Sequence, residues 1–223
     1  MEIYHGSQII LKEPIYNGSK ARNDYGKGFY TTQEKELAKE WASSKNSPGY
    51  VNIYDLDINS LNILNLNNDQ YNILNWLAIL TKHRTYWQSH SIGEKAKDYL
   101  QDNFYIDVNK YDIIIGYRAD DSYFSFAQDF INNVISLRKL SRAMKLGKLG
   151  EQLVLKSEKA FKQIKFIDSE IVDYQKYYLL KVERDQQARY DYFFSKQEED
   201  NLEDIYMLDI LREEIKNGDP RLQ

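Results

Sequence analysis

One stretch decides how the chain is interpreted: Asp24-Tyr25-Gly26-Lys27-Gly28-Phe29-Tyr30-Thr31-Thr32. Its two glycines flank a lysine, so the backbone there can turn tightly or approach a ligand closely. The four residues after Gly28 favour extended backbone, which predicts a short strand. Alternation along that strand places Phe29 on one face and Tyr30 on the other. Tyr30 is therefore the aromatic side chain expected to face a cleft.

A helix is expected directly after this strand, over residues 33–41. Thr31 or Thr32 can cap it, because a side-chain hydroxyl can accept a hydrogen bond from a free backbone N–H of the first turn. Helical spacing brings Leu37 and Trp41 to one face. Trp41 is thereby the second aromatic residue of interest, eleven positions after Tyr30.

A second segment near the amino terminus, Ile3-Tyr4-His5-Gly6-Ser7, reads as an aromatic-rich strand that ends in His-Gly-Ser. With the Gly-Lys-Gly-Phe-Tyr run and Trp41, it resembles the ADP-ribosyltransferases of the branch that includes the poly(ADP-ribose) polymerases and diphtheria-type toxins. The chain is also similar to a family of small bacterial proteins of the same clan, which carry YHGS, DFGKGFYxTT and QxxFxTEKA-like segments. The third segment corresponds here to residues 151–160, and the resemblance covers about residues 3 to 168.

This resemblance implies transfer of ADP-ribose from NAD, which is a co-substrate. It implies that His5 donates a hydrogen bond to the adenosine-side ribose hydroxyl, that the backbone of Gly6 pairs with the nicotinamide carboxamide, and that Ser7 adds a polar contact. Tyr30 and Trp41 would hold the nicotinamide between two aromatic faces, which favour a cationic ring. The second aromatic of the family is usually tyrosine, so Trp41 keeps the face and loses the hydroxyl.

The third position of the family motif differs in this chain. The polymerases carry a glutamate there, which binds the nicotinamide-ribose hydroxyl and activates the acceptor. Matching strand to strand places Gln152 at that position and Glu151 just before it, and only one of two successive side chains can point into the cleft. We choose Gln152, whose amide accepts a hydrogen bond but takes no proton near neutral pH. Transfer of a single ADP-ribose unit is therefore expected, whereas an inward Glu151 would restore a carboxylate mechanism.

Other candidate residues are less specific. Gly28 can bring backbone close to the cofactor, and Arg22, the lone arginine of a polar loop, either contacts a phosphate or is a solvated surface residue. Asp120 and Asp121 follow a predicted buried strand; one can cap the next helix, and the pair leaves room for a role at the substrate side of the cleft. His83 and His90 are only a weak metal signal, and no metal site is expected.

Charge is distributed unevenly along the chain, whose formal net charge is −4. Residues 138–165 carry nine basic and two acidic side chains, whereas residues 198–214 carry eight acidic and one basic. These segments can attract each other, within the chain or between chains, or be two solvated helix faces. Alternatively, the basic segment meets the phosphates of a nucleotide or nucleic acid.

Composition limits the class of protein. The chain has 223 residues and no cysteine, which excludes disulfides, thiolate metal sites and cysteine nucleophiles. It shows no signal peptide and no apolar run near the about 18 residues that cross a bilayer, so we expect a cytoplasmic protein without membrane contact. We expect an α/β (α+β) fold with a split, mostly antiparallel sheet over residues 1–170 and a helical extension over residues 171–223.

The spacing of apolar residues, together with the residues that start or end helices and strands, predicts the remaining elements. Strands are expected over residues 51–58, 111–116, 152–155 and 164–171. Helices are expected over residues 71–80, 94–104 and 122–135, in a short segment from Ser157, and through the tail, which ends in an amphipathic helix with Leu202, Ile205, Leu208, Leu211 and Ile215. Residues 137–149 are interpreted as a linking segment.

The functional expectation is an NAD-dependent mono-ADP-ribosyltransferase that modifies an intracellular protein, RNA or DNA. A bacterial toxin or phage-defence effector, held by an antitoxin or chaperone partner, is the role that the family analogy suggests. The alternative is a catalytically silent module that binds NAD or ADP-ribose and acts through protein contacts.

Overall fold

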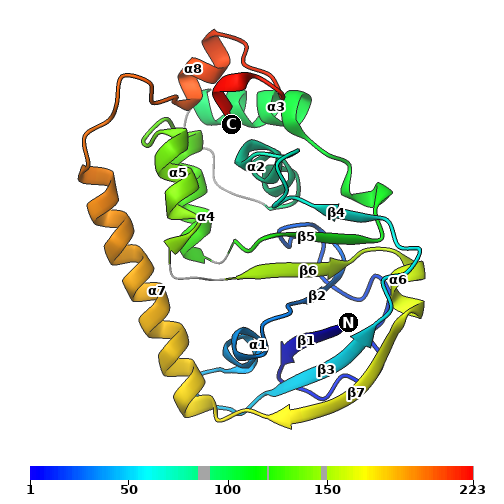
Figure 1. Cartoon of the computed structure of the whole chain (residues 1–223). Helices are drawn as coiled ribbons and strands as arrows, with labels where there is room; N and C mark the ends of the chain where they lie inside the picture. The colour runs from blue at the N-terminus through cyan, green and yellow to red at the C-terminus, as the bar shows by residue number, and fades with distance from the viewer. Residues whose placement is uncertain (85–90, 120, 147–149, 223) are drawn as a thin grey trace.

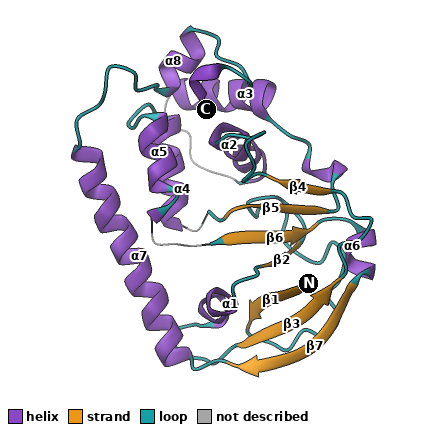
Figure 2. Cartoon of the chain, in the orientation of Figure 1, coloured by secondary structure: helices purple, strands orange, loops and turns teal. Residues whose placement is uncertain are grey.

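The computed structural model describes residues 1–84, 91–119, 121–146 and 150–222; of residues 91, 121 and 122 it describes the backbone only. Two sheets lie next to each other: most of the helices lie beyond one of them, and the other forms the lower edge of the molecule in the view of Figures 1 and 2. The expected α/β fold with a split sheet is confirmed: one sheet is antiparallel, and the other is mixed.

The two sheets are built from strands that are distant along the chain. The antiparallel sheet has the order β1 (Glu2–Ser7), β3 (Tyr50–Leu56) and β7 (Ile164–Ile171). The mixed sheet has the order β2 (Phe29–Thr31), β6 (Glu151–Leu155), β5 (Ile113–Tyr117) and β4 (Ile63–Asn65), with only β4 and β5 parallel. A single bridge between Tyr4 and Thr32 connects the sheets, so β1 and β2 meet where the two sheets diverge.

The helices follow in chain order. They are α1 (Lys35–Ala42), α2 (Ile73–His83), α3 (Ser91–Phe104), α4 (Asp121–Ile131), α5 (Leu137–Ala143), α6 (Glu158–Lys162), α7 (Tyr174–Gln197) and α8 (Met207–Arg212). Short 3-10 turns span Val108–Lys110 and Pro220–Leu222.

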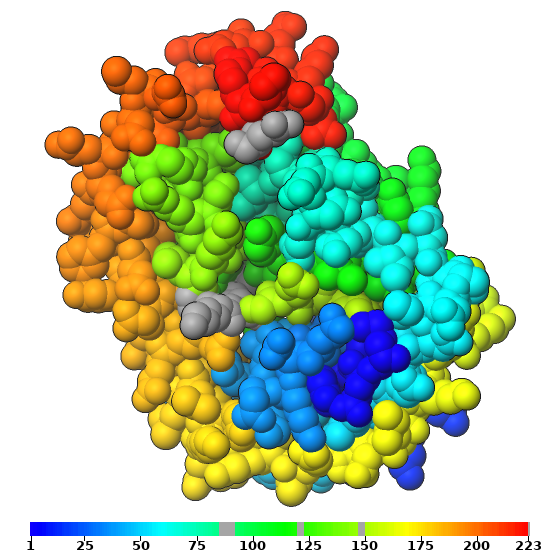
Figure 3. All heavy atoms as spheres, viewed as in Figure 1, coloured from blue at the N-terminus to red at the C-terminus, as the bar shows by residue number. Residues whose placement is uncertain are grey.

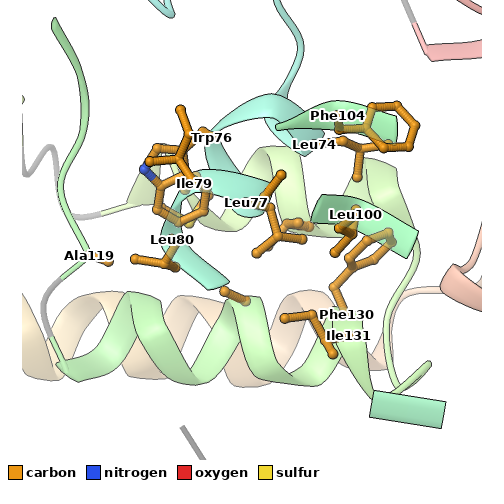
Figure 4. Packing of buried hydrophobic residues seen from close by; sticks show 14 of the residues in the cluster. Leu74, Trp76, Leu77, Ile79, Leu80, Leu100, Phe104, Ala119, Phe130 and Ile131 are labelled. Atoms are coloured by element: carbon orange, nitrogen blue, oxygen red, sulfur yellow. The ribbon is translucent and has the colours of Figure 1, made fainter. Parts of the chain in front are cut away.

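Apolar side chains pack in three layers. One cluster lies between the sheets and includes Ile3, Phe29 and Leu155. A second lies under α1 and the start of α7 and includes Ala38 and Tyr177. The largest lies under the helices that cover the mixed sheet, and Figure 4 shows α2, α3 and α4 meeting in it. These layers fix β1 and β2 as rigid elements on which side chains can be positioned.

The structure confirms most of the predicted elements and corrects a few. Helix α1 begins at Lys35 rather than residue 33, and its N-cap is Glu34, so neither Thr31 nor Thr32 is the cap. The Thr32 hydroxyl instead accepts a hydrogen bond from the Glu34 N–H at 3.1 Å. Residues 137–149, expected as a linker, contain α5, because Ser136 caps that helix through the Lys139 N–H.

The tail departs from the amphipathic helix that was expected at its end. Leu202 is fully exposed and lies before α8, in which Met207 and Ile210 are the buried residues. Helix α7 runs along one whole side of the molecule, where it forms a continuous orange and yellow band (Figures 1 and 3). It packs against α1 near its start and against α4 and α5 further on.

The attraction expected between the basic and acidic segments occurs within the chain. Arg138 makes two hydrogen bonds of 2.7 Å to Asp204. Lys139, whose side chain is 4% exposed, pairs with Asp200 at 2.9 Å. These contacts attach the end of α7 and the segment after it to α5. Across the described ranges, no helix combines the length and apolar character that crossing a membrane requires.

Candidate functional site

A cavity of about 940 Å³ opens where the two sheets diverge. This volume lies within the range of about 300–1,000 Å³ that is usual for small-molecule sites. It is lined from β1, the loop before β2, β2 itself, α1, the segment after β5, β6 and α7. Six of the residues predicted for the site line it: His5, Gly6, Gly28, Tyr30, Trp41 and Gln152.

Gly6 lets α1 lie directly on β1. A Cβ atom at this position would come within 2.0 Å of the Ala38 carbonyl oxygen and 2.7 Å of the Ala42 nitrogen. Moving these backbone atoms would cost much free energy, so only glycine allows the helix to come this close. The glycine was expected to admit the nicotinamide; its structural reason is the seating of the helix that carries Trp41.

The Gly-Lys-Gly loop is likewise explained by contacts within the chain. Gly26 has a φ of +74°, and a Cβ there would lie 2.7 Å from the His83 ring. A Cβ at Gly28 would lie 2.6 Å from a methyl of Val154. The amine of Lys156 donates to the Tyr25 and Lys27 carbonyls at 2.7 and 2.6 Å, and its burial lowers its pKa to about 8. The loop is thereby fixed against β6.

Tyr30 is anchored through its hydroxyl. The hydroxyl donates to the Gly26 carbonyl at 2.7 Å and accepts from the Tyr25 N–H at 3.0 Å. Burial raises the pKa of Tyr30 well above its usual value. The phenol is therefore neutral at physiological pH, and its two hydrogen bonds go to the loop, so its ring is what remains for a ligand.

His5 lies beside Tyr30 with a defined tautomer. Its Nδ1 is 2.7 Å from the Tyr30 carbonyl oxygen, which can only accept, so Nδ1 carries the proton. Burial lowers the pKa of His5, which keeps the ring neutral at pH 7. Its Nε2 is then an acceptor. The expected donation from His5 to a ribose hydroxyl is thus reversed: a hydroxyl at Nε2 would donate to the ring.

Trp41 lines the cavity from α1. The guanidinium of Arg118 lies 4.9 Å from the centre of its ring, in a cation–π contact. The indole Nε1 is buried, with no hydrogen-bond partner among the described residues. The Trp41 ring is thus already in contact with a positive charge. The sequence did not predict this contact, because Arg118 follows β5, far along the chain from Trp41.

Gln152, at the third position of the family motif, faces the cavity with its side-chain amide. Gln152 is 6% exposed and lines the cavity, whereas Glu151 is exposed and does not. The Gln152 amide nitrogen donates to Asp24 at 3.4 Å, and its oxygen is buried with no partner in the described part of the chain. Strand alternation therefore places these two side chains as expected.

Asp24 is the site residue that sequence reasoning missed. It lies in the cavity wall, is 5% exposed, and accepts a hydrogen bond of 2.8 Å from the Ala119 N–H. The guanidinium of Arg84 lies 3.7 Å from its other oxygen. Burial raises the pKa of Asp24 to about 6, against these stabilising contacts. The only feature of the sequence that indicated a role for Asp24 is that this acidic residue lies two positions before the Gly-Lys-Gly run.

Basic residues outnumber acidic ones around the cavity. The basic residues are Arg84, Arg118, Lys181, Arg184 and Arg189, and the acidic ones are Asp24, Glu40 and Asp185. Arg184 pairs with the buried Glu40 at 2.6 Å, which attaches α7 to α1. Three of the five cations come from α7, in the tail outside the resemblance. Arg189 pairs with Asp185 at 2.9 Å. The excess of basic over acidic groups around the cavity, rather than each cation by itself, suits an anionic ligand.

Several predicted residues lie elsewhere. The Ser7 hydroxyl donates to the Ile9 carbonyl at 2.6 Å, and neither Ser7 nor the exposed Arg22 lines the cavity. Asp120 lies outside the described residues, and Asp121 begins α4. Where the chain is described, no group of three or more His, Cys, Asp or Glu residues could hold a metal; His90 falls outside that part.

Comparison with known proteins gives one match. The model of a family described as "Protein of unknown function (DUF3990)" matches residues 1–166. No curated protein and no solved structure matches the chain. The matched range includes β1, the Gly-Lys-Gly loop, α1 and β6, and it ends before α7.

Proposed function

The chain belongs to the DUF3990 family, and from the cavity described above we propose that it is an NAD-dependent mono-ADP-ribosyltransferase acting on a macromolecule. One observation carries the proposal. His5, Tyr30, Trp41 and Gln152 come from β1, β2, α1 and β6, and all four line the same cavity. These are the positions that the resemblance assigns to an NAD site.

The reaction breaks the bond between a ribose carbon and a positively charged nicotinamide, through a transition state in which the sugar resembles an oxocarbenium ion. The rings of Tyr30 and Trp41 offer aromatic faces to the pyridinium. Nε2 of His5 accepts from a ribose hydroxyl, and the Gln152 amide accepts from another. Holding the cofactor in one geometry is the main contribution of such residues.

The cations on α7 give the proposal a place for the diphosphate. Lys181, Arg184 and Arg189 line the same cavity as the aromatic rings, so an elongated dinucleotide can lie between them. Guanidinium groups bind phosphate oxygens through paired hydrogen bonds. One cavity thus offers aromatic rings for the nicotinamide and cations for the diphosphate at the centre of NAD.

The acceptor is a protein or a nucleic acid, and the proposed role is that of an intracellular toxin or phage-defence effector restrained by a partner, by analogy with the resembled family. The basic segment lends a nucleic-acid acceptor less support than its charge alone suggests. Arg138, Lys139 and Arg142 all pair with acidic residues of the tail.

Incubation with labelled NAD and a cell lysate tests the proposal. Label on a macromolecule, removable by nuclease or by protease, supports it and identifies the class of acceptor. Nicotinamide release without label means NAD hydrolysis. Binding of NAD with neither outcome means a catalytically silent module and contradicts the proposal.

Two neighbouring substitutions sharpen this test. Gln152→Ala removes the amide that faces the cavity and is expected to lower the rate of nicotinamide release by about 10-fold or more, the effect of about one lost transition-state hydrogen bond. Glu151→Ala changes an exposed side chain and is the matched control, expected to keep the wild-type rate. The reverse pattern would mean that Glu151, not Gln152, serves the reaction.

A further inference from the structure

We propose that Asp24 supplies the carboxylate of this site, acting beside Gln152 as the base that takes the proton of the incoming nucleophile. This inference rests on the proposed function. The resembled family places its carboxylate on the strand corresponding to β6, where this chain has an amide. Here the acidic group comes from the loop before β2, on a different element from Gln152.

The geometry places Asp24 beside the reacting end of the cavity. Its Oδ2 lies 3.4 Å from the Gln152 amide nitrogen, and Asp24 lines the same cavity as Tyr30 and His5. The same Oδ2 accepts from the Ala119 N–H at 2.8 Å, which fixes the orientation of the carboxylate. A side chain that is 5% exposed and held in this way is pre-positioned rather than solvated.

Few groups stabilise the negative charge of the buried Asp24 carboxylate. Among the described residues, its one hydrogen bond shorter than 3 Å comes from Ala119, and the Arg84 guanidinium lies 3.7 Å away, too far for a strong hydrogen bond. Burial consequently raises its pKa to about 6. A carboxylate tuned toward neutrality is a better proton acceptor than an exposed one, and such tuning is usual for a general base.

The charges around Asp24 come from several elements. Arg84 follows α2 and Arg118 follows β5, and both favour the ionised carboxylate. Tyr25 and Tyr30 are neutral phenols whose pKa values are raised by burial. His5 lines the same cavity and is kept neutral by burial. The ionisation of Asp24 therefore changes near pH 6, where the neutral phenols and the neutral His5 ring add no charge to the cavity.

The proposed step balances without an added reagent. A hydroxyl, amine or water attacks the anomeric carbon of the nicotinamide ribose as the carbon–nitrogen bond to nicotinamide breaks. The pyridinium leaves with that electron pair as neutral nicotinamide. The proton of the attacking group passes to the Asp24 carboxylate and then to solvent, while the Gln152 amide holds the ribose.

Asp24→Asn tests the inference, because asparagine keeps the shape and an oxygen for the Ala119 N–H but cannot take the proton. NAD affinity and nicotinamide release are measured separately, from pH 5 to 8.5. We expect affinity within about 5-fold of wild type and release lowered by about 100-fold, the usual scale of general base catalysis. We also expect the wild-type rate to fall below about pH 6, and this acid limb to vanish in the variant.

The matched control is Glu151→Gln, the same chemical change on an exposed carboxylate, which is expected to leave rate and pH profile unchanged. Undiminished release in Asp24→Asn overturns the inference. So does an equal loss of NAD affinity and rate with the acid limb retained, because Asp24 is then a structural residue only.

If Asp24→Asn does not fold, Asp24→Glu replaces it: an acid limb displaced from that of wild type supports the inference, and an undisplaced limb overturns it. Wild-type protein that releases no nicotinamide refutes the proposed function itself, and this inference with it.

Discussion

The carboxylate of Asp24 is costly to the folded state. Its pKa is about 6 in the folded protein and 3.8 in a model peptide, so the folded state binds the proton more tightly than the unfolded state does. Stability therefore decreases as the pH rises from about 4 to about 6, and the full cost is present above the folded pKa. Such a cost is the usual sign of a residue retained for function rather than for folding.

At the residue scale we expect Asp24→Asn to be more stable than wild type at pH 7.5 by up to about 3 kcal/mol, since one pKa unit corresponds to about 1.4 kcal/mol. The difference should shrink toward zero at about pH 4, where Asp24 is protonated in the folded state. Urea unfolding midpoints at several pH values measure it. A stability difference that is the same at pH 4 and pH 7.5 would contradict this assignment of the cost.

Sequence reasoning identified most of the lining residues that lie on strands and helices, although not Ser7, and it missed Asp24 of the loop before β2. Alternation along β6 separated Gln152 from Glu151 because a strand has a fixed period of two. Asp24 lies in a loop, where no period says which way a side chain points. The tautomer of His5 was also beyond prediction, because it depends on a carbonyl that belongs to β2.

At the element scale, the contact between β1 and α1 positions the cavity wall. Two glycines permit it: a Cβ at Gly6 or at Gly49 would come within 2.0 Å of a carbonyl oxygen of α1. Trp41 is on that helix, next to the contact. The position of the indole thus depends on the absence of side chains on two neighbouring strand segments.

We expect Gly6→Ala to destabilise the fold by about 3 kcal/mol, because the added methyl meets backbone rather than a flexible side chain. It should also move α1 and change the contribution of Trp41 to the tryptophan fluorescence, which Trp76→Phe and Trp87→Phe background substitutions isolate. Thermal unfolding and fluorescence measure the two effects.

Gly93→Ala is the control for this substitution. Its Cβ would meet the end of the Asn132 side chain at 3.1 Å and a methyl group of Ile131 at an ordinary 3.9 Å. The position lies in α3, where alanine is the better helix former. We expect unchanged or slightly raised stability. A Gly6→Ala protein as stable as the Gly93→Ala protein would mean that α1 shifts without cost.

Element prediction was reliable where caps and periods agreed, as at α6, which Ser157 caps through the Ala160 N–H. Prediction failed at α5 because the basic residues and the later Gly-Lys-Leu-Gly run are typical of a linker, although a short helix precedes that run. The start of α1 was missed because Glu34 provides no side-chain cap. Such a boundary is decided by packing on β1 rather than by local sequence.

At the scale of the whole molecule, α7 connects parts that the sheets separate. It begins beside the antiparallel sheet, lines the cavity along its middle, and packs against α4 and α5 near its end (Figure 1). Ala188 and Tyr192 of α7 belong to the largest core cluster. The tail from residue 171 to residue 222 is therefore integrated with the core, and the expected helical extension supplies part of the candidate site.

Lys139 secures that arrangement at its far end. Its amine is nearly buried, pairs with Asp200, and donates to the Glu198 carbonyl at 2.6 Å. We expect Lys139→Met to cost about 1–3 kcal/mol, because it leaves buried acceptors without a partner. Hydrogen exchange should become faster in α7, and NAD affinity should fall because α7 forms a wall of the cavity.

Arg142→Met is the matched control, since the Arg142–Glu198 pair is more than half exposed on both sides. Exposed pairs contribute little, so stability should change by less than about 0.5 kcal/mol. Equal effects of the two substitutions would mean that Lys139 does not hold the tail. The sequence indicated this attraction through its charge blocks but not which residues pair, since pairing depends on the fold.

The position of α7 in the chain also bears on how the protein is made. Synthesis proceeds from the amino terminus, so a nascent chain carries His5, Tyr30, Trp41 and Gln152 well before Lys181 and Arg184 leave the ribosome. The cations that α7 contributes to the cavity are thus added after the other lining residues. A ribosome-bound chain would hold the rings of the site without the wall that α7 forms, so the cavity is complete only once this helix has been translated and has folded against α1.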